Sequence, residues 1–420
     1  MRNFVISFLG FALAAVGARS ADWPQWRGPN RDDVSLEKGL QKTWPTGGPR
    51  LLWRFEAAGL GFSGPAVVGN RLYTLGAVGD EEHVLAIDVR NGKRVWSTAI
   101  GPTFINGWGD GPRGTPTVDG DFLYAIGGQG NLVCVETASG KKRWSVSLEH
   151  DLGGQMMSGW GYTESPLVDG DKVICSPGGS QGTLAALDKK TGAVIWRSRG
   201  LTDAAAYSSM IVADVGGNRQ YIQMTSAGVV GVAARDGRPL WHSDEATNTT
   251  AIIPTPVFHD RYVYVTSGYH AGCALIKLVS NSQGLRAETV YSNKTMVNQH
   301  GGVVRVGEYV YGYSDSEGWV CQEFKTGRRM WAEMRKLGKG SLTFADGHLY
   351  CYSERDGTVV LIKATPAGWH ETGRFTIPLH TSQPRKSGQI WTHPVVANGR
   401  LYLRDQDLIY CYEISVPNGD

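Results

Sequence analysis

The chain has little charge, little cysteine and few long apolar runs. Only 19% of its 420 residues are charged, with 42 Lys and Arg against 39 Asp and Glu. This balance gives no electrostatic basis for binding nucleic acid, so we expect no such partner. Beyond the N-terminal segment no apolar stretch is long enough to cross a bilayer, which excludes a transmembrane helix from the rest of the sequence.

The six cysteines are scattered, and no two of them are adjacent or arranged as CxxC. This pattern excludes a vicinal disulfide, a thioredoxin-like motif and a CxxCH haem site. Cys134 and Cys321 each lie six residues before a turn glycine, and Cys411 occupies the matching place, where other repeats have Ala86 and Ala186. We therefore predict free thiols that fill a small-residue packing position.

The N-terminus has the features of a secretory leader. Arg2 precedes an apolar run over residues 4–16, and Ala18-Arg19-Ser20 supplies the small residues of a cleavage site. We predict that residues 1–20 are a signal peptide and that the mature protein is exported to the periplasm or outside the cell. No cysteine follows the leader, so no lipid anchor is expected.

Tryptophan, in contrast, recurs at a near-constant interval. It ends the same short phrase at intervals of 43, 48, 52 and 45 residues, at Trp53, Trp96, Trp144, Trp196 and Trp241. Tyr291 and Phe375 stand at the same position in two later repeats. A period of this length, filled with short strand-like runs, is typical of the blades of a β-propeller, because one such sheet cannot bury both of its faces alone.

Each repeat contains two hairpins. Runs such as TVDGDFLY and VVANGRLY place Asp-Gly or Asn-Gly between two apolar strands, and a second hairpin ends at the tryptophan, as in LVCVETASGKKRW. Two hairpins make one four-stranded blade. This register predicts eight first strands, which begin near Gly64, Gly114, Ser165, Ser208, Thr255, Gly301, Gly340 and Thr392.

The two ends of the repeat region complement each other. The eighth repeat has no tryptophan strand at its end, whereas residues 51–56 form such a strand with no repeat before it. Pairing between them would close the ring and remove its exposed sheet edges. The sequence therefore predicts an all-β fold over residues 51–416, an eight-bladed β-propeller of four-stranded antiparallel blades that is closed by pairing of the N- and C-terminal strands.

The segment before the propeller, residues 21–50, is rich in Trp, Pro, Gly and charge and shows no strand alternation. We predict an extended N-terminal arm. Its Trp23, Trp26 and Trp44 carry large apolar surfaces, so we expect them either to pack along the ring or to insert into a partner.

The repeats resemble a known family. The phrase from Asp188-Lys189-Lys190-Thr191-Gly192 to Trp196 is similar to the PQQ-like, quinoprotein-type propeller repeat, and the resemblance covers about residues 50–415. The segments 22–29, 107–113 and 177–179 resemble exported PQQ-like repeat proteins of the BamB-like group. This resemblance implies a propeller in the cell envelope that works as a non-catalytic binding or assembly scaffold, with a protein or peptide as its partner and a glycan as the alternative.

Other proteins with this repeat are PQQ-dependent alcohol dehydrogenases. Resemblance to those enzymes would imply PQQ bound with Ca²⁺ among Glu, Asn and Asp, against a disulfide between adjacent cysteines. No two cysteines are adjacent here, and the chain is short for the insertions that build such a pocket. The scaffold is therefore favoured, and a PQQ-dependent dehydrogenase or a carbohydrate-active propeller remains the alternative.

Function usually lies on loops, and the loops that enter the first strands of a propeller converge at one mouth of its channel. Trp108, Trp160 and Trp391 could stack there on a planar or sugar ligand, while Arg113 and Lys339 neutralise a carboxylate or phosphate. Alternatively, the tryptophans plug the channel and Arg113 binds strand-end carbonyls. The candidate ligand-binding residues are Trp108, Asp110, Arg113, Trp160, Tyr162, Glu164, Tyr207, His300, Lys339, Trp391 and His393.

We predict no catalytic or metal-binding residue within this set. Asp110 and Glu164 could in principle work as an acid and a base, but their loops belong to two blades and their spacing supports no pair. His300 and His393 lack a further ligand at a metal-binding interval. Solvated carboxylates and ordinary histidines are the expected outcome.

Overall fold

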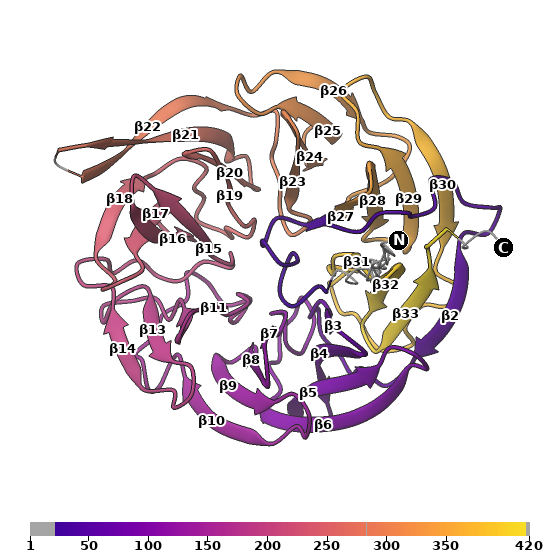
Figure 1. The fold of residues 1–420 in the computed structure, drawn as a ribbon, viewed down its shortest axis with the longest axis horizontal. Helices are drawn as coiled ribbons and strands as arrows, with labels where there is room; N and C mark the ends of the chain where they lie inside the picture. Colours follow the sequence, from indigo (N-terminus) through magenta and orange to yellow (C-terminus); the bar gives the residue numbers. More distant parts are fainter. Residues whose placement is uncertain (1–21, 283, 417–420) are drawn as a thin grey trace, which may run out of the picture.

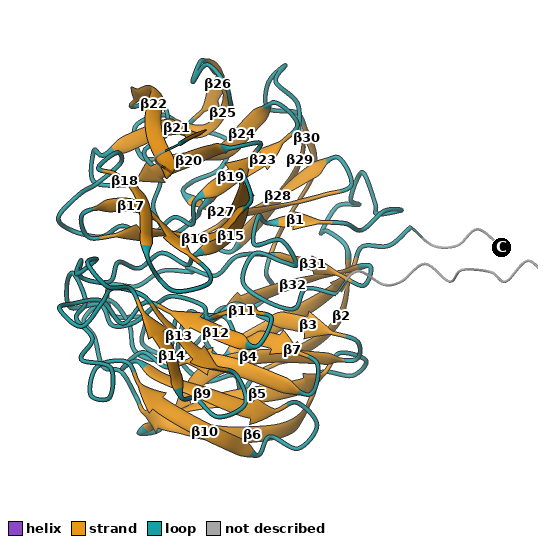
Figure 2. Cartoon of the chain, turned by 60° about the vertical axis from the view of Figure 1, so that its left-hand side comes forward, coloured by secondary structure: helices purple, strands orange, loops and turns teal. Residues whose placement is uncertain are grey.

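The computed structural model describes residues 22–282 and 284–416, and the predicted signal peptide lies outside this part of the chain. Eight sheets stand around a central axis like the blades of a propeller (Figure 1). The predicted eight-bladed propeller is confirmed. Within the described residues, strands joined by turns and loops make up the secondary structure (Figure 2), and no helix is long and apolar enough to cross a membrane.

The first four blades follow the chain without a crossover. Their strands are β3 (Ala66–Val68), β4 (Arg71–Val78), β5 (Glu81–Asp88) and β6 (Lys93–Pro102) in blade 1; β7 (Thr117–Asp119), β8 (Phe122–Ile126), β9 (Asn131–Glu136) and β10 (Lys142–Ser147) in blade 2; β11 (Leu167–Asp169), β12 (Lys172–Cys175), β13 (Ala185–Asp188) and β14 (Val194–Arg197) in blade 3; β15 (Ile211–Val215), β16 (Asn218–Thr225), β17 (Gly228–Ala233) and β18 (Pro239–Ser243) in blade 4.

The last four blades include both additions from the N-terminal region. Their strands are β19 (Val257–His259), β20 (Tyr262–Ser267), β21 (Gly272–Asn281) and β22 (Gly284–Asn293) in blade 5; β23 (Val303–Val306), β24 (Tyr309–Ser314), β25 (Gly318–Glu323) and β26 (Arg329–Glu333) in blade 6; β27 (Gly340–Ala345), β28 (His348–Ser353), β29 (Thr358–Lys363), β30 (Glu371–Thr376) and the added β1 (Val34–Ser35) in blade 7; β31 (Val395–Ala397), β32 (Arg400–Asp405), β33 (Leu408–Glu413) and β2 (Arg50–Phe55) in blade 8.

The ring closes as predicted. Strand β2 pairs antiparallel with β33, so that Trp53 lies opposite Cys411 and the start of the repeat region completes the last blade. Apolar side chains fill the spaces between neighbouring blades. One such cluster joins Trp53 to Val67 and Leu72 of blade 1. The hydrophobic core is thus distributed around the ring, and each blade is stable only beside its neighbours.

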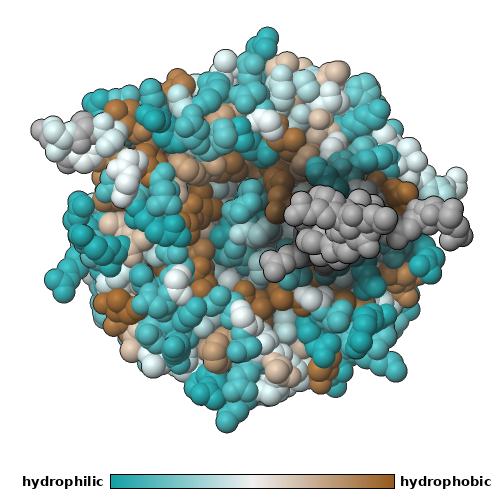
Figure 3. All heavy atoms as spheres, in the orientation of Figure 1, coloured by the Kyte–Doolittle hydropathy of each residue, from teal (hydrophilic) through white to brown (hydrophobic). Residues whose placement is uncertain are grey.

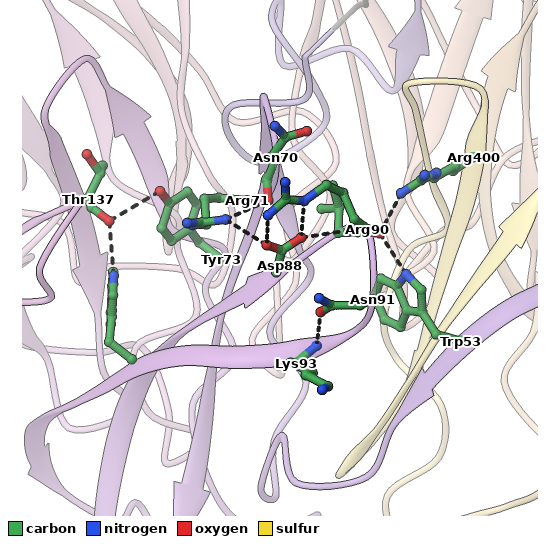
Figure 4. A network of polar contacts seen from close by, with 12 residues as sticks. Trp53, Asn70, Arg71, Tyr73, Asp88, Arg90, Asn91, Lys93, Thr137 and Arg400 are labelled. Carbon is green, nitrogen blue, oxygen red and sulfur yellow. Dashed lines mark hydrogen bonds and ion pairs between the residues drawn. The ribbon is translucent and has the colours of Figure 1, made fainter.

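The recurring tryptophans connect neighbouring blades. The indole N–H of Trp53 donates to the carbonyl of Val89 in the next blade at 2.7 Å (Figure 4), and Trp96 and Trp144 make the same kind of bond to later blades. The glycine of the same turn packs on the indole ring of Trp53. A Cβ at Gly92, whose φ is +68°, would lie only 2.8 Å from Trp53. The period in the sequence is therefore the period of this contact between blades.

The cysteines occupy the place that the sequence predicted. All six are buried and free. Cys134 lies directly across the sheet from Trp144, and Cys321 from Trp331. A large indole on one strand leaves room for only a small side chain on its neighbour, which accounts for the alanines at this position in other repeats.

The N-terminal arm departs from the prediction in one respect, because β1 within it pairs in parallel with β27 and adds a fifth strand to blade 7. Two residues are too short to show the alternation of a strand in the sequence. Trp23 is buried, and its backbone forms an antiparallel bridge with Val67. The ring centres of Trp44 and Phe375 lie 5.3 Å apart. Between these anchors the arm passes through the middle of the ring (Figure 1).

Candidate functional site

The loops that enter the first strands surround a cavity of about 400 Å³ at one end of the ring. Six of the predicted candidates line this mouth cavity: Trp108, Arg113, Trp160, Tyr207, His300 and Trp391. These residues could be grouped from the sequence because each lies in a loop that follows the outermost strand of one blade and enters the first strand of the next. A larger and more open hollow of about 670 Å³ lies beside it, lined mainly by the polar residues 244–250 between blades 4 and 5.

One side of the mouth cavity is an aromatic wall from blades 2 to 4, which we call the first wall: Trp108, Trp160 and Tyr207. The rings of Trp108 and Trp160 meet edge to face with centres 6.2 Å apart, and Trp160 lies 5.6 Å from Tyr207. The Tyr207 hydroxyl contacts Ser158 Oγ at 2.5 Å and accepts the Trp160 backbone N–H at 3.2 Å. These bonds hold the wall in place, while Trp108 remains 48% exposed.

A second wall comes from blades 8, 1 and 6: Trp391, Phe62 and His300. The Trp391 ring lies 5.0 Å from Phe62 and 5.8 Å from His300. Its indole N–H donates to Glu354 Oε2 at 3.0 Å, and His300 Nε2 lies 3.1 Å from the same oxygen. Burial, with the positive charge of Lys339, holds the pKa of His300 well below its usual value, so the imidazole is neutral at pH 7.

The N-terminal arm forms the floor of the mouth cavity. The Trp26 indole donates to Thr255 Oγ1 at 2.9 Å and packs 4.6 Å from the His393 ring. Arg27 beside it is fully buried, with Nε 2.8 Å from Asp33 Oδ2. The same oxygen lies 3.1 Å from His393 Nδ1. His393, which the sequence placed at the rim, is thus part of the packing beneath the floor.

The arm reaches this position from the other face of the ring. The Gly69 N–H donates to Asp22 at 2.9 Å, and the Leu40 N–H donates to Asp346 at 3.0 Å. Both partners belong to turns between first and second strands, which lie at the end opposite the mouth. The arm therefore enters the channel from below, and its residues Trp26 and Arg27 line the bottom of the cavity. The space-filling view has the orientation of Figure 1 and shows this face, from which the arm enters, with mostly hydrophilic residues at the periphery of the ring and hydrophobic residues nearer its middle (Figure 3).

Arg113 lies at the corner between the two walls. Its Nη1 donates to the carbonyl of Gly111 at 2.6 Å and its Nη2 to that of Gly109 at 2.8 Å, while Cζ lies 5.4 Å from the Phe62 ring centre and 4.9 Å from that of Phe104. Burial lowers the pKa of Arg113 to about 10, so the guanidinium remains charged at neutral pH. Arg113 binds loop carbonyls, as one of the two sequence-based interpretations expected, and it also lines the cavity, so its action on a ligand stays a prediction.

Three further predicted residues lie outside the mouth cavity with other partners. Lys386 Nζ lies 2.6 Å from Asp110 Oδ1, so this acid is neutralised locally. The hydroxyl of Tyr162 donates to the carbonyl of Pro177 at 3.1 Å, in a buried position. Lys339 pairs with Asp315 at 2.7 Å. The position of a loop at the rim did not predict where its side chains point, because each side chain turns toward a local hydrogen-bond or ion-pair partner.

Glu164 is the predicted residue farthest from its expected state. It is fully buried next to the arm and is not a solvated carboxylate. Its Oε1 accepts the Ser176 N–H at 2.5 Å, and Oε2 has no partner among the described residues. Burial raises its pKa to about 7, although the nearby charge of Arg31 opposes that change. Because Asp110 and Glu164 have separate environments and partners, they are not an acid and base facing one substrate.

This buried carboxyl predicts a pH dependence of stability. Its pKa is 4.5 when solvated and about 7 in the fold, so the folded protein holds the proton more tightly. The stability contributed by Glu164 is present below pH 4.5 and lost as the pH rises to about 7. We expect Glu164→Gln to gain up to about 3 kcal/mol relative to the unchanged protein between these values. Urea unfolding of both proteins at both pH values measures this difference. The same change in the free energy of unfolding with pH for both proteins would contradict the raised pKa of Glu164.

Trp26 and Tyr269 are two of the mouth-cavity residues that sequence reasoning missed. Trp26 was assigned to the arm, and only the passage of the arm through the ring brings it under the loops. Tyr269 lies in the turn between β20 and β21 with φ of +53°, and it is 37% exposed. A bulky residue with positive φ is uncommon and marks a place of interest, but the sequence alone does not display a dihedral angle.

The residues that line the mouth cavity do not fit a PQQ–calcium centre. They include two arginines and one histidine but no Asp or Glu. Calcium needs six to eight oxygen ligands with carboxylates among them. Over the part of the chain that the structure describes, no group of three or more His, Cys, Asp or Glu could hold a metal ion. The lining is that of an aromatic pocket that also contains positively charged arginine side chains.

Comparison with known proteins places this fold. The family whose model matches the chain is described as outer membrane protein assembly factor BamB, and the match covers residues 80–333, which is more than half of the chain. The chain belongs to this family. A curated relative, the outer membrane protein assembly factor BamB of Salmonella typhimurium, is 28% identical over 183 residues. That match covers 41% of this chain and 40% of the relative, so the two share less than half of their lengths.

Solved structures agree on the architecture. BamB from Moraxella catarrhalis superimposes with a TM-score of 0.56 at 17% identity, covering 82% of this chain and 95% of that one. The quinohemoprotein alcohol dehydrogenase from Comamonas testosteroni gives a TM-score of 0.62 at 13% identity, covering 95% of this chain and 81% of that one. At such identities the similarity shows the shared fold, which proteins of the BamB family and quinoproteins use for different purposes.

Proposed function

We propose that this member of the BamB family is an exported, non-catalytic binding scaffold of the cell envelope that holds a protein or peptide partner at the mouth of its ring. The BamB-named relatives support a role in assembly, and the predicted leader supports export. Propeller loops converge on one mouth, which concentrates contacts from many blades on one partner.

One observation carries this proposal. The mouth presents apolar ring surface to solvent, while the acids near it are bound to protein partners. Trp108 is 48% exposed at the edge of the first wall, whereas Asp110 is neutralised by Lys386 and Glu354 accepts from Trp391. Exposed aromatic surface around a preformed pocket is typical of binding sites, and Trp is enriched among residues that dominate binding energy.

Site-specific photo-crosslinking tests this role. A benzophenone amino acid is placed at Trp108 and, as a matched control, at Val194 on the outer strand β14, because both side chains are 48% exposed. We expect irradiation of cells to yield a protein adduct of defined mass from position 108 alone, in the exported fraction. Equal adducts from both positions, or none from position 108 in folded protein, would contradict a partner at the mouth.

The catalytic alternatives make different predictions. A PQQ-dependent dehydrogenase should show a raised melting temperature with PQQ and Ca²⁺ and should reduce a dye with an alcohol or sugar. A carbohydrate-active propeller should cleave glycans and lose activity when Asp110 or Glu164 is neutralised. We expect no turnover and no rise in the melting temperature that requires Ca²⁺ together with PQQ. Either result in purified mature protein would replace the scaffold proposal.

A further inference from the structure

The charged side chains that line the mouth cavity are all positive. Its lining contains Arg27, Arg113 and the neutral His300, without any Asp or Glu. Arg27 is neutralised by Asp33 beneath the floor. Arg113 has no carboxylate within 4 Å among the described residues. Glu82, whose charge acts on Arg113, is held instead by the backbone N–H groups of Phe104 and Gly128. Arg113 is thus the positive charge that faces the cavity.

The hydrogen-bonding groups of the cavity are mainly unmatched donors. A guanidinium has five N–H donors, and two of those of Arg113 are used by loop carbonyls. Within the described chain, the indole N–H groups of Trp108 and Trp160 make no hydrogen bond. Two side-chain hydroxyls already accept a hydrogen bond, Thr255 Oγ1 from Trp26 and Ser209 Oγ from the backbone, whereas the Tyr269 hydroxyl, which also lines the cavity, has no hydrogen bond among the described residues. A complementary ligand supplies acceptors and few donors.

These features separate two classes of ring-shaped ligand. A neutral sugar also stacks on tryptophan, but each of its hydroxyls brings a donor that needs an acceptor. A flat aromatic acid brings a π-face for the two walls and only acceptors for Arg113 and the free indole N–H groups. The cavity of about 400 Å³ lies within the size range of pockets that enclose small ligands.

We propose that the mouth cavity binds an aromatic group that carries a carboxylate, with the ring between the first and second walls and the carboxylate on Arg113, without a metal ion. This inference rests on the proposed binding function and names the chemistry of its ligand. The same chemistry occurs in a free aromatic acid and in a C-terminal aromatic residue of a polypeptide, and the experiment below distinguishes these two sources.

Isothermal titration of the mature protein with indole-3-acetate and indole-3-acetamide tests the carboxylate requirement. The two probes differ in charge but share the ring. We expect the acid to bind at least about tenfold more tightly than the amide, and high salt to weaken only the acid. Equal affinities for acid and amide, or no binding of either to folded protein, would overturn the proposal.

Two variants assign the effect to the residues named. In Arg113→Gln the affinity for the acid should fall to that for the amide. Arg305→Gln is the matched control, because Arg305 also lies over a phenylalanine, 5.1 Å from the Phe324 ring centre, but outside the cavity. Trp108→Ala should weaken acid and amide by a similar factor. Because Trp108 is half exposed, this variant keeps the test decisive if Arg113→Gln does not fold.

Peptides identify the source of the carboxylate. A short peptide ending in a free phenylalanine is compared with the same peptide amidated at its C-terminus. Preference for the free terminus indicates a polypeptide partner, and binding of the small acid alone indicates a free aromatic acid. If crosslinking captures a partner while no acid binds, this inference fails and the proposed scaffold stands. If the acid binds and no partner is captured, the scaffold proposal fails instead.

Discussion

Replacement of Arg404 by Met should lower the free energy of unfolding by about 4 kcal/mol. Arg404 is fully buried on β32, where blade 8 meets blade 1. Its guanidinium donates to the carbonyls of Gln406, Ser63 and Leu75 at 2.6–2.8 Å and to that of Gly59 at 3.1 Å. Removing it leaves several buried carbonyls without donors at the seam that closes the ring.

The size of the effect follows from where these carbonyls lie. Each buried acceptor left without a partner costs roughly 1–3 kcal/mol, although relaxation and water entry reduce the sum. Burial lowers the pKa of Arg404 to about 9, yet its hydrogen bonds keep it in place. Arg404→Lys should recover little, because an ammonium cannot reach so many fixed acceptors.

Urea unfolding monitored by tryptophan fluorescence measures this prediction. The control is Arg54→Met on β2 of the same blade, because Arg54 is partly exposed and, among the described residues, forms its ion pair with Glu56 alone. A surface pair of this kind contributes less than about 1 kcal/mol. Equal effects of the two substitutions would show that the buried arginine is not the connection between blades 8 and 1.

Asp33→Asn should cost about 3 kcal/mol and loosen the N-terminal arm. Asp33 is fully buried in the middle of the ring, 2.8 Å from Arg27 Nε and 3.1 Å from His393 Nδ1. Its φ is +59°, a conformation that asparagine also tolerates, so the substitution changes charge while keeping shape and backbone. The loss of the anion leaves the Arg27 charge buried without compensation.

Limited proteolysis within residues 22–36 and urea unfolding together measure the outcome. Asp32→Asn is the control, since burial raises the pKa of the neighbouring Asp32 and it forms no ion pair among the described residues. We expect that variant to be nearly neutral. Because Trp26 forms the floor of the mouth cavity, Asp33→Asn should also lower the affinity of any ligand that binds there. Unchanged cleavage and stability would show that the arm is held by its flanking anchors alone.

Much of the fold was readable from the chain. The tryptophan interval predicted the blades because four of the five indoles, those of Trp53, Trp96, Trp144 and Trp196, pack against a turn glycine of the next blade, a contact that requires both residues at one spacing. The turn dipeptides placed all first strands within a few residues. The strand before the first repeat predicted the closure with β33. Local pattern was sufficient here because every blade repeats the same contacts.

The candidate site was readable only in part. The loop positions of Trp108, Trp160 and Trp391 were predicted to converge, and they line one cavity. Their neighbours Asp110 and Glu164 turned elsewhere, to Lys386 and to the buried Ser176 N–H. No spacing in the sequence reports the partner that a side chain of an irregular loop finds.

By itself the sequence determined the all-β class, the eight blades, their register and the mouth at which the loops meet, because these follow from turn chemistry and periodic packing between neighbours in the chain. The tertiary structure alone decided that the arm crosses the ring, that Trp26 becomes the floor of the cavity and that Arg113 faces it without an acid. These outcomes depend on contacts such as Arg27 with Val303 and Asp33 with His393, which join residues hundreds of positions apart. Contacts of that range leave no periodic trace in the chain.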